Sequence, residues 1–341
     1  MTTLTSPHDL ISAIPFLIGY HPADSLVVVS IKDDCVGMAM RVDYPSDLPA
    51  SAYDLLASHL QREGSSGALL VAYVPESRND GEAVLSDLSA ALKRIDVAID
   101  ESLLIKGGRY RSMICTDSLC CPSGGRDLPE ISASRIALEH VIAGRTMPFA
   151  NIEALTDSIS PLVISEDSKW INQVSKFAKV DKKTNLNALQ RDGATAVLDL
   201  AGEFAAGRGS EDLELTARVI GRLCDIQVRD FALGSHTDED IDSYFLMWRQ
   251  LMRMAPVGQV APVASLFAAL AYESGDGALA HRALDRALAD INGYALALLL
   301  RRVFTAGWPP QSFAAMRREL HPKVSAGIFG TENGFLGNET F

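Results

Sequence analysis

The chain has 341 residues, more than one hydrophobic core usually supports, so we expect two domains. Hydrophobic residues make up 48% and charged residues 22%, a globular composition that excludes a disordered chain. The net charge of -12, with no dense run of lysine and arginine, would repel a polyphosphate backbone, so we expect no nucleic-acid partner.

The amino terminus and the cysteines indicate the compartment. No basic region followed by a long apolar stretch and a small-residue cleavage site resembles a secretory signal. The apolar residues 10–19 are interrupted by Pro15 and are fewer than the roughly 20 that a bilayer span requires. Five cysteines, an odd number in a chain of this size, do not indicate a disulfide framework. We therefore expect a soluble protein of the reducing cytoplasm, with no membrane partner.

Residues 1–165 are predicted to form an α/β domain. Ser6-Pro7-His8-Asp9 has the form of a helix start, and we expect Pro15 to stop that helix at about Ala13. Apolar, β-branched runs then alternate with segments that place apolar residues on one helical face. We expect strands at 25–31 and 35–42, a helix at 50–61, a strand at 68–74, a helix at 81–94, and strands at 97–105 and 110–114. This order implies a mixed sheet with helices against it.

The second half is predicted to be all-helical, with a connector at residues 166–184, a helical domain at 185–325 and a tail at 326–341. Strand patterns end at about Asn185, and amphipathic segments follow one another over short linkers. We expect helices at 186–206, 212–231, 239–254, 261–272, 278–291, 294–304 and 312–320. Residues 266–292 resemble a tetratricopeptide repeat through their small alanines, but only one repeat is legible, and a plain helical bundle is the alternative.

The stretch from Cys115 to Arg126 carries three of the five cysteines and ends in a glycine-rich loop. Zinc prefers thiolate and imidazole ligands in tetrahedral array, so Cys115, Cys120 and Cys121 are candidate metal ligands. Neighbouring side chains tend to diverge and no second cysteine or histidine knuckle follows, so a fourth ligand would come from a distant residue such as His21 or His140.

Three other interpretations of the same stretch remain open. Cys120 and Arg126 have the Cys-x5-Arg spacing of phosphatase-type loops, in which a thiolate attacks and an arginine binds the oxyanion. A disulfide between the adjacent Cys120 and Cys121 would close a strained, reducible ring. The ordinary interpretation, which we favour from sequence alone, is that reduced thiols fill space in a tight Pro-Gly loop.

Two further groups are candidate ligand-binding residues. Arg109 and Arg111 lie on one face of the strand that leads into the cysteines and could bind an anion together with Arg126, although arginines on an edge strand commonly serve solubility. His21, Asp24 and Ser25 collect residue types found in hydrolase sites. They stand where a turn enters a strand, and there Asp and Ser more often make turn hydrogen bonds.

Several segments together resemble a known family. Residues 9–11 and 15–29, Arg41-Val-Asp43, Arg111-Ser112 with the three cysteines and Pro122, and residues 275–280 resemble an actinobacterial family of unknown function, DUF4192. The resemblance covers most of the chain. It implies a cytoplasmic protein of that kind of bacterium and supplies no reaction, ligand or catalytic residue.

These observations favour a non-catalytic protein-interaction or regulatory protein, for which we expect a protein partner. The alternative is a thiol-dependent enzyme, or an anion-binding or metal-binding protein, in which the loop with Cys115, Cys120 and Cys121 does the chemistry. The sequence identifies no cofactor; zinc is the metal that the metal-binding variant of this alternative would use.

Overall fold

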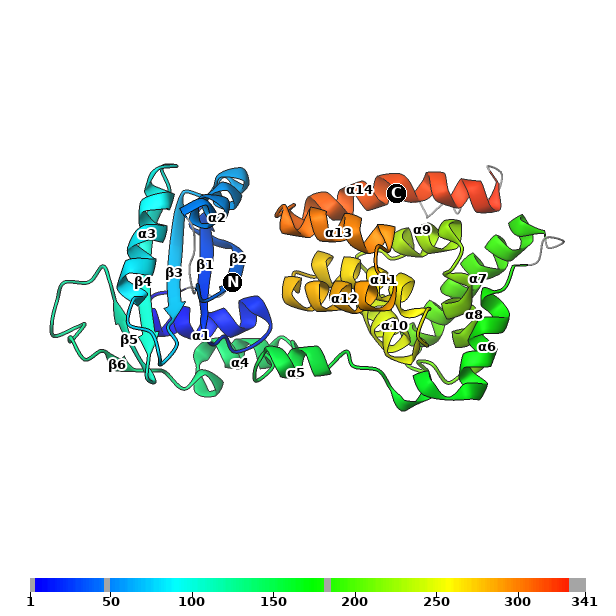
Figure 1. Ribbon diagram of the computed structural model, residues 1–341, viewed down its shortest axis with the longest axis horizontal. Helices are drawn as coiled ribbons and strands as arrows, with labels where there is room; N and C mark the ends of the chain where they lie inside the picture. Colours follow the sequence, from blue (N-terminus) through cyan, green and yellow to red (C-terminus); the bar gives the residue numbers. More distant parts are fainter. Residues whose placement is uncertain (1–3, 46–49, 181–184, 331–341) are drawn as a thin grey trace. The chain divides into compact units, whose positions relative to one another are not determined.

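The computed structural model describes residues 4–45, 50–180 and 185–330. The chain divides into two compact units between Leu155 and Thr156 (Figure 1). The first unit is a mixed sheet with helices and the second is helical, as the sequence predicts. Among the described helices, none combines the length and the apolarity that crossing a bilayer requires.

The first unit is built on a six-stranded sheet with the order β2-β1-β3-β4-β5-β6. The elements are α1 (Pro7–Ile18), β1 (Ser25–Lys32), β2 (Cys35–Asp43), α2 (Ala50–Glu63), β3 (Gly67–Tyr73), α3 (Gly81–Lys93), β4 (Ala98–Lys106), β5 (Arg109–Ser112), β6 (Arg126–Asp127), the 3-10 helix η1 (Ile131–Ala133), α4 (Arg135–Ile142) and, across the unit boundary, α5 (Ile152–Asp157).

Among the neighbouring strands of this sheet, β3 and β4 pair in parallel, because α3 connects them as a crossover. The other neighbouring strands pair antiparallel.

The residue types in the hairpin turns and the alternation of side chains along the strands explain how the sheet forms. Asp33 and Asp34 between β1 and β2, and Gly107 and Gly108 between β4 and β5, all have positive φ, as two-residue hairpin turns require. Alternate residues of the strands point to the helix-covered face, where they form a buried apolar core with α2 and α3. That core includes Leu26, Val28, Tyr53, Leu56, Leu60, Leu70, Val84, Leu85, Leu88 and Leu92.

Helix α1 differs from its sequence prediction, because it runs through Pro15 to Ile18. Proline removes one backbone hydrogen bond, and the prediction that it would stop the helix was wrong. Ile14 and Ile18 on either side are buried, so packing of the apolar face maintains the helix beyond the missing bond. Gly19, with φ of 85°, then ends it by donating its N–H to the carbonyl of Pro15.

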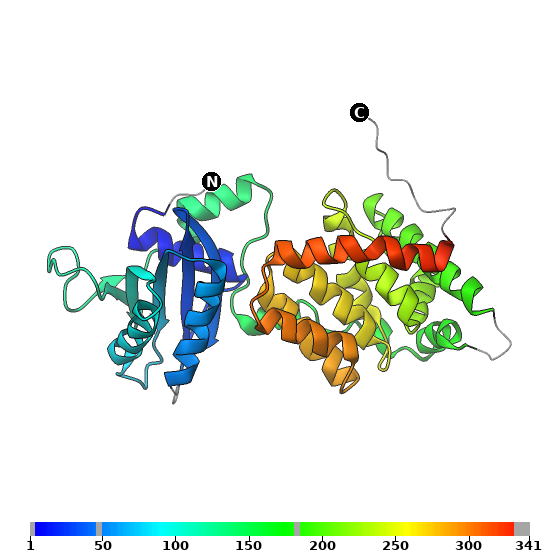
Figure 2. The same cartoon turned by 90° about the horizontal axis from the view of Figure 1, so that it is seen from above.

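The second unit consists of helices that follow one another over short loops (Figure 2). Helices α11 and α12 pack against each other across the loop at 274–276, and α14 lies against α9 and contacts α7 and α11. The elements are η2 (Val163–Glu166), α6 (Ser168–Ala178), α7 (Leu186–Ala205), α8 (Leu213–Arg222), α9 (Ile226–Gly234), α10 (Ile241–Met254), α11 (Val260–Glu273), α12 (Gly277–Asp290), α13 (Ala295–Thr305) and α14 (Pro310–Phe329).

The predicted connector at 166–184 contains a packed helix, α6. Asp167 caps α6 by accepting the N–H groups of Lys169 and Trp170. Trp170 is buried, and its indole N–H donates to the carbonyl of Met254 at 2.7 Å. The sequence did not predict α6, because the segment is rich in lysine and only one face of the helix is buried. Residues 181–184 of the predicted connector lie outside the described residues.

Two other predicted boundaries are corrected by local packing and capping. The single helix expected at 212–231 is two helices, α8 and α9, because Asp225 accepts the N–H groups of Gln227 and Val228 and so begins a new helix. Helix α14 continues past Pro322 into the predicted tail at 326–341, since Ile328 is buried against α7 and α9. Residues 331–341 of that tail lie outside the described residues.

His321 on α14 is expected to make the stability of the second unit depend on pH. Burial, with smaller contributions from Arg317 and His236, lowers the pKa of His321 below 6.5, and Nδ1 has no hydrogen-bond partner among the described residues. The unfolded chain therefore binds more protons as the pH falls through about 6.5, so the stability present above that pH declines below it.

We expect the urea midpoint of the second unit to fall between pH 7 and about 5.5, and to fall less in His321→Phe. The imidazole already packs against Phe231, with ring centroids 5.1 Å apart, so the replacement ring suits the site. Tryptophan fluorescence measures this unit alone, because all three tryptophans of the chain lie in it. An equal pH dependence in the variant would exclude His321 as the source.

Candidate functional site

Residues 113–125 form a long loop between β5 and β6 at the edge of the sheet, which we call the Cys loop (Figures 1 and 2). The loop leaves the sheet after Ser112 and returns at Arg126, which pairs with Tyr110 of β5. Both ends are therefore anchored on adjacent strands. The tip is open to solvent, since the side chain of Leu119 is 87% exposed.

The Cys loop brings its three cysteine sulfurs together. The Sγ atoms of Cys115, Cys120 and Cys121 all lie within 4.8 Å of one another. Ligands of a tetrahedral zinc with Zn–S bonds of 2.3 Å lie about 3.8 Å apart, so a small inward movement would place all three around one ion. The side chains of neighbouring cysteines tend to diverge, but a turn in which the N–H of Cys121 donates to the carbonyl of Asp117 at 2.7 Å overcomes this tendency.

Ser112 holds the first cysteine at the base of the loop. Its Oγ accepts the N–H of Cys115 at 3.0 Å and that of Ile114 at 3.2 Å, and donates to Oε1 of Glu101 at 2.7 Å. Ser112 is buried, so these bonds are shielded from water. The backbone that carries Cys115 is thus attached to the neighbouring strand β4.

Arg126 and Arg109 hold the rest of the loop. Arg126 donates to the carbonyls of Leu119 and Cys120, and Arg109 donates to those of Gly124 and Gly125, each at 2.8 Å. Arg109 also pairs with Asp127 at 2.8 Å. Both guanidinium groups bind backbone oxygens of the loop, an arrangement that braces the cysteines rather than presenting donors to an oxyanion above a thiolate.

The third predicted anion-binding residue is also engaged. Arg111 forms an ion pair with Glu82 at the start of α3. All three arginines therefore bind protein groups. Arg109 and Arg126 bind backbone carbonyls of the Cys loop, and Arg111 binds Glu82 outside it.

The thiol of Cys121 is protonated at neutral pH in this arrangement. Burial, together with side-chain hydrogen bonds to Cys115 and Cys120 that favour the protonated thiol, raises the pKa of Cys121 to about 11, although a backbone hydrogen bond at Ser112 opposes the shift. A thiolate nucleophile needs the opposite shift. A metal ion would supply the positive charge that replaces these protons.

The histidine, aspartate and serine near β1 do not form a catalytic arrangement. Ser25 is buried and its Oγ makes no hydrogen bond among the described residues, so neither His21 nor Asp24 activates it. Asp24 has φ of 42°, and its backbone carbonyl accepts the N–H of Tyr44, which extends the pairing of β1 with β2. Burial lowers the pKa of His21.

The two histidines considered as fourth metal ligands have other surroundings. The backbone N–H of His21 donates to the carbonyl of Phe149 at 2.9 Å, and the ring of His140 lies 4.3 Å from that of Phe16. Within the described ranges, the group of ligand atoms that converges at the Cys loop contains the three sulfurs alone.

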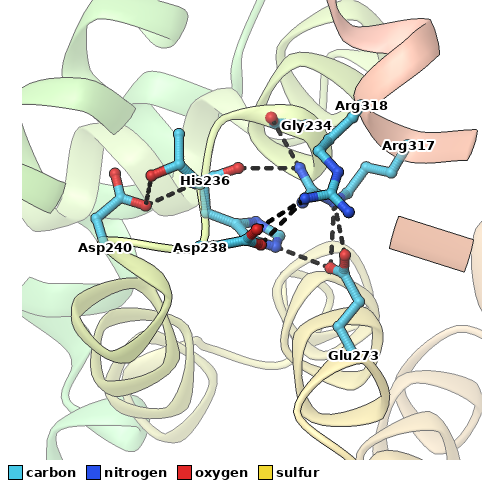
Figure 3. A network of polar contacts seen from close by, with 8 residues as sticks. Gly234, His236, Asp238, Asp240, Glu273, Arg317 and Arg318 are labelled. Atoms are coloured by element: carbon cyan, nitrogen blue, oxygen red, sulfur yellow. Dashed lines mark hydrogen bonds and ion pairs between the residues drawn. The ribbon is translucent and has the colours of Figure 1, made fainter. Parts of the chain in front are cut away.

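A second polar cluster, which the sequence analysis missed, lies in the helical unit (Figure 3). Nε of Arg317 is 3.1 Å from both carboxylate oxygens of Glu273, and its Nη1 donates to the carbonyls of Gly234 and His236 at 3.0 Å. Nε2 of His236 lies 2.8 Å from the same carboxylate. These groups join α14 to the ends of α9 and α11, and no motif predicts them because they are far apart in the chain.

Comparison with known proteins gives one match. A family model described as a domain of unknown function, DUF4192, matches residues 7–311. No curated protein and no solved structure matches the chain. The match includes the Cys loop and ends near the start of α14.

Proposed function

Because the chain belongs to the DUF4192 family, whose description names no activity, we propose a function from the geometry of the Cys loop. The protein is a non-catalytic regulatory protein that binds zinc through Cys115, Cys120 and Cys121. The observation that carries this proposal is the convergence of three Sγ atoms within 4.8 Å on a loop braced from both sides.

The ligand chemistry supports zinc over other divalent ions. Thiolates select soft or borderline metals and exclude magnesium and calcium, which require oxygen ligands. With three protein ligands, the fourth position of a tetrahedral zinc is left for water or an exchangeable ligand. Such a zinc ion is held less firmly than one in a four-cysteine site, which suits a regulatory role.

The position of Arg126 supports a non-catalytic role over the thiol-enzyme alternative, in which Cys120 is the nucleophile and Arg126 binds the anion. Arg126 donates to the carbonyls of Leu119 and Cys120, so these donors are not directed at a substrate anion. The thiol-enzyme alternative would require Arg126 to change partners.

The proposed output of the site is the binding of a protein partner by the helical unit. Helices α11 and α12 carry the tetratricopeptide-like spacing and pack as a pair. Leu298 and Leu299 on α13, and Trp308 after it, keep apolar side chains exposed. We place the protein in the cytoplasm, where thiols such as those of the Cys loop stay reduced.

Metal content tests the proposal directly. We expect protein purified without chelator to contain one zinc ion per chain, and the metal-free chain to take up cobalt with a thiolate-to-cobalt charge-transfer band. Cys121→Ser removes one of three thiolates and is expected to weaken metal binding at least about tenfold. Cys35→Ser is the matched control, because Cys35 begins β2 and lies outside the sulfur cluster.

The expected contrast is a clear loss of the cobalt band in Cys121→Ser and an unchanged band in Cys35→Ser. Wild-type protein that contains no zinc by elemental analysis and shows no cobalt band would overturn the proposal. Circular dichroism of both variants establishes that the fold is retained.

A further inference from the structure

The Cys loop has three thiols. A disulfide needs two of them, whereas a tetrahedral zinc ion prefers four ligands. A site of this composition can exchange its metal for a bond between two of its own sulfurs. The exchange requires an accessible sulfur, a second sulfur within reach and a backbone that keeps its shape when the metal leaves. Each of these is present in the Cys loop.

Cys120 is the accessible sulfur. It is exposed, beside the exposed Leu119 at the tip of the loop, whereas Cys115 and Cys121 are partly covered. An oxidant in solution therefore reaches Cys120 first, since oxidation of cysteines follows exposure as well as thiolate character.

Cys115 is the second sulfur. Its Sγ lies within 4.8 Å of that of Cys120, and four residues lie between the two cysteines along the chain. A bond between Cys120 and its neighbour Cys121 would instead close a strained ring. The backbone around both cysteines is held by Ser112 and Arg126 through bonds that involve no metal. The loop can therefore form a disulfide without unfolding.

We propose that the Cys loop is a reversible oxidation site for hydrogen peroxide, in which a Cys115–Cys120 disulfide replaces the zinc ion. This inference rests on the proposed zinc site. The sulfur of Cys120 attacks one peroxide oxygen; an S–O bond forms, the O–O bond breaks and the departing oxygen leaves as water. The sulfur of Cys115 then attacks that of Cys120; the S–S bond forms, the S–O bond breaks and a second water leaves.

The two sulfurs together lose two electrons, and the peroxide gains them. The protons that complete the two water molecules come from the thiols, or from solvent when the sulfurs are bound to zinc as thiolates. Cys121 alone cannot hold the metal, so the zinc ion is released. A thiol reductant breaks the disulfide and restores all three ligands.

Peptide mass spectrometry of the full-length protein tests the inference. Cleavage after Arg111 and Arg126 yields residues 112–126, which contain the three loop cysteines and exclude Cys35 and Cys224. After hydrogen peroxide treatment, we expect this peptide to lose two hydrogen atoms. Zinc release, followed with a chromogenic chelator, should match disulfide formation mole for mole. Cys35, which is partly covered, serves as the internal reference thiol and is expected to be oxidised more slowly.

Two variants separate this inference from the proposed function. Cys121→Ser should lose metal binding and still form the disulfide, whereas Cys115→Ser should instead accumulate a sulfenic acid on Cys120 that dimedone traps. A two-hydrogen loss that persists in Cys115→Ser, or disulfide formation that releases no zinc, would overturn the inference. Wild-type protein that binds no zinc overturns the proposed function, a result that the cobalt titration reveals separately.

Discussion

Replacement of Arg317 by leucine is expected to lower the free energy of unfolding of the helical unit by about 3–5 kcal/mol, because it leaves a buried carboxylate uncompensated. Arg317 is 4% exposed, and the side chain of Glu273, which it contacts through Nε, is also 4% exposed (Figure 3). The substitution also removes the donor to the carbonyls of Gly234 and His236. His236 alone would then remain beside the carboxylate, and its imidazole is neutral unless it binds a proton.

The neighbouring arginine supplies a matched control. Arg318 pairs with Asp238 at 2.9 Å, but the carboxylate is 80% exposed, and exposed ion pairs contribute about 0–1 kcal/mol. Arg318→Leu should therefore change stability little, although it removes the same charge from the same helix. Urea unfolding followed by tryptophan fluorescence compares the two variants. Equal losses in both would show that the network around Glu273 does not stabilise the position of α14.

The double variant Arg317→Leu with Glu273→Leu distinguishes the cost of an unpaired charge from the contribution of the pair. Replacing both buried partners by apolar side chains removes the uncompensated carboxylate, so the double variant is expected to be more stable than Arg317→Leu alone. The variant Glu273→Leu, measured alone, completes the comparison. If the stability losses of Arg317→Leu and Glu273→Leu add up to that of the double variant, the network does not act as a unit.

The secondary structure was largely predictable because its signals are local. Strand β1 is a run of β-branched residues, and the turns at Asp33-Asp34 and Gly107-Gly108 contain residues that tolerate positive φ. The break between α8 and α9 was missed although the cap at Asp225 is local. The other failures are places where long-range packing overrides a local rule. Pro15 lies inside α1 because its flanking isoleucines are buried, and the connector prediction missed α6 because a single tryptophan, Trp170, supplies much of its buried contact.

The candidate site could be found from sequence but its geometry could not. The composition of residues 115–126 identifies the cysteines, and several interpretations of them remain open at that level. What brings the sulfurs together is the set of bonds from Arg109, Arg126 and Ser112 to the backbone of the loop. Arginines with these neighbours could equally bind a substrate anion, and only the positions of their partners in the fold distinguish the two roles.

The bracing of the loop depends on Gly125, so Gly125→Ala is expected to weaken zinc or cobalt binding by about 10- to 100-fold, the usual effect of disturbing groups that position metal ligands. Gly125 is buried with φ of 70°, and a Cβ there would lie 2.8 Å from the backbone carbonyl oxygen of Tyr110. Because that oxygen belongs to β5, it cannot move without disturbing the sheet. An alanine would strain the backbone and displace the turn that Arg109 holds.

Gly124→Ala is the matched control for this substitution. A Cβ on Gly124 meets no atom within 4 Å, so the same change one residue earlier should leave the cobalt band and the affinity as they are in the wild type. Thermal unfolding establishes that both variants fold, and cobalt titration then compares their affinities. The N–H of Gly125 donates to the carbonyl of Pro122 at 2.8 Å and so closes a turn. If folded Gly125→Ala bound cobalt as tightly as Gly124→Ala, this turn at Pro122–Gly125 would not position the sulfurs. The convergence of the three cysteines would then depend on their own contacts with the metal, because a ligand set that forms only around the ion needs no braced backbone.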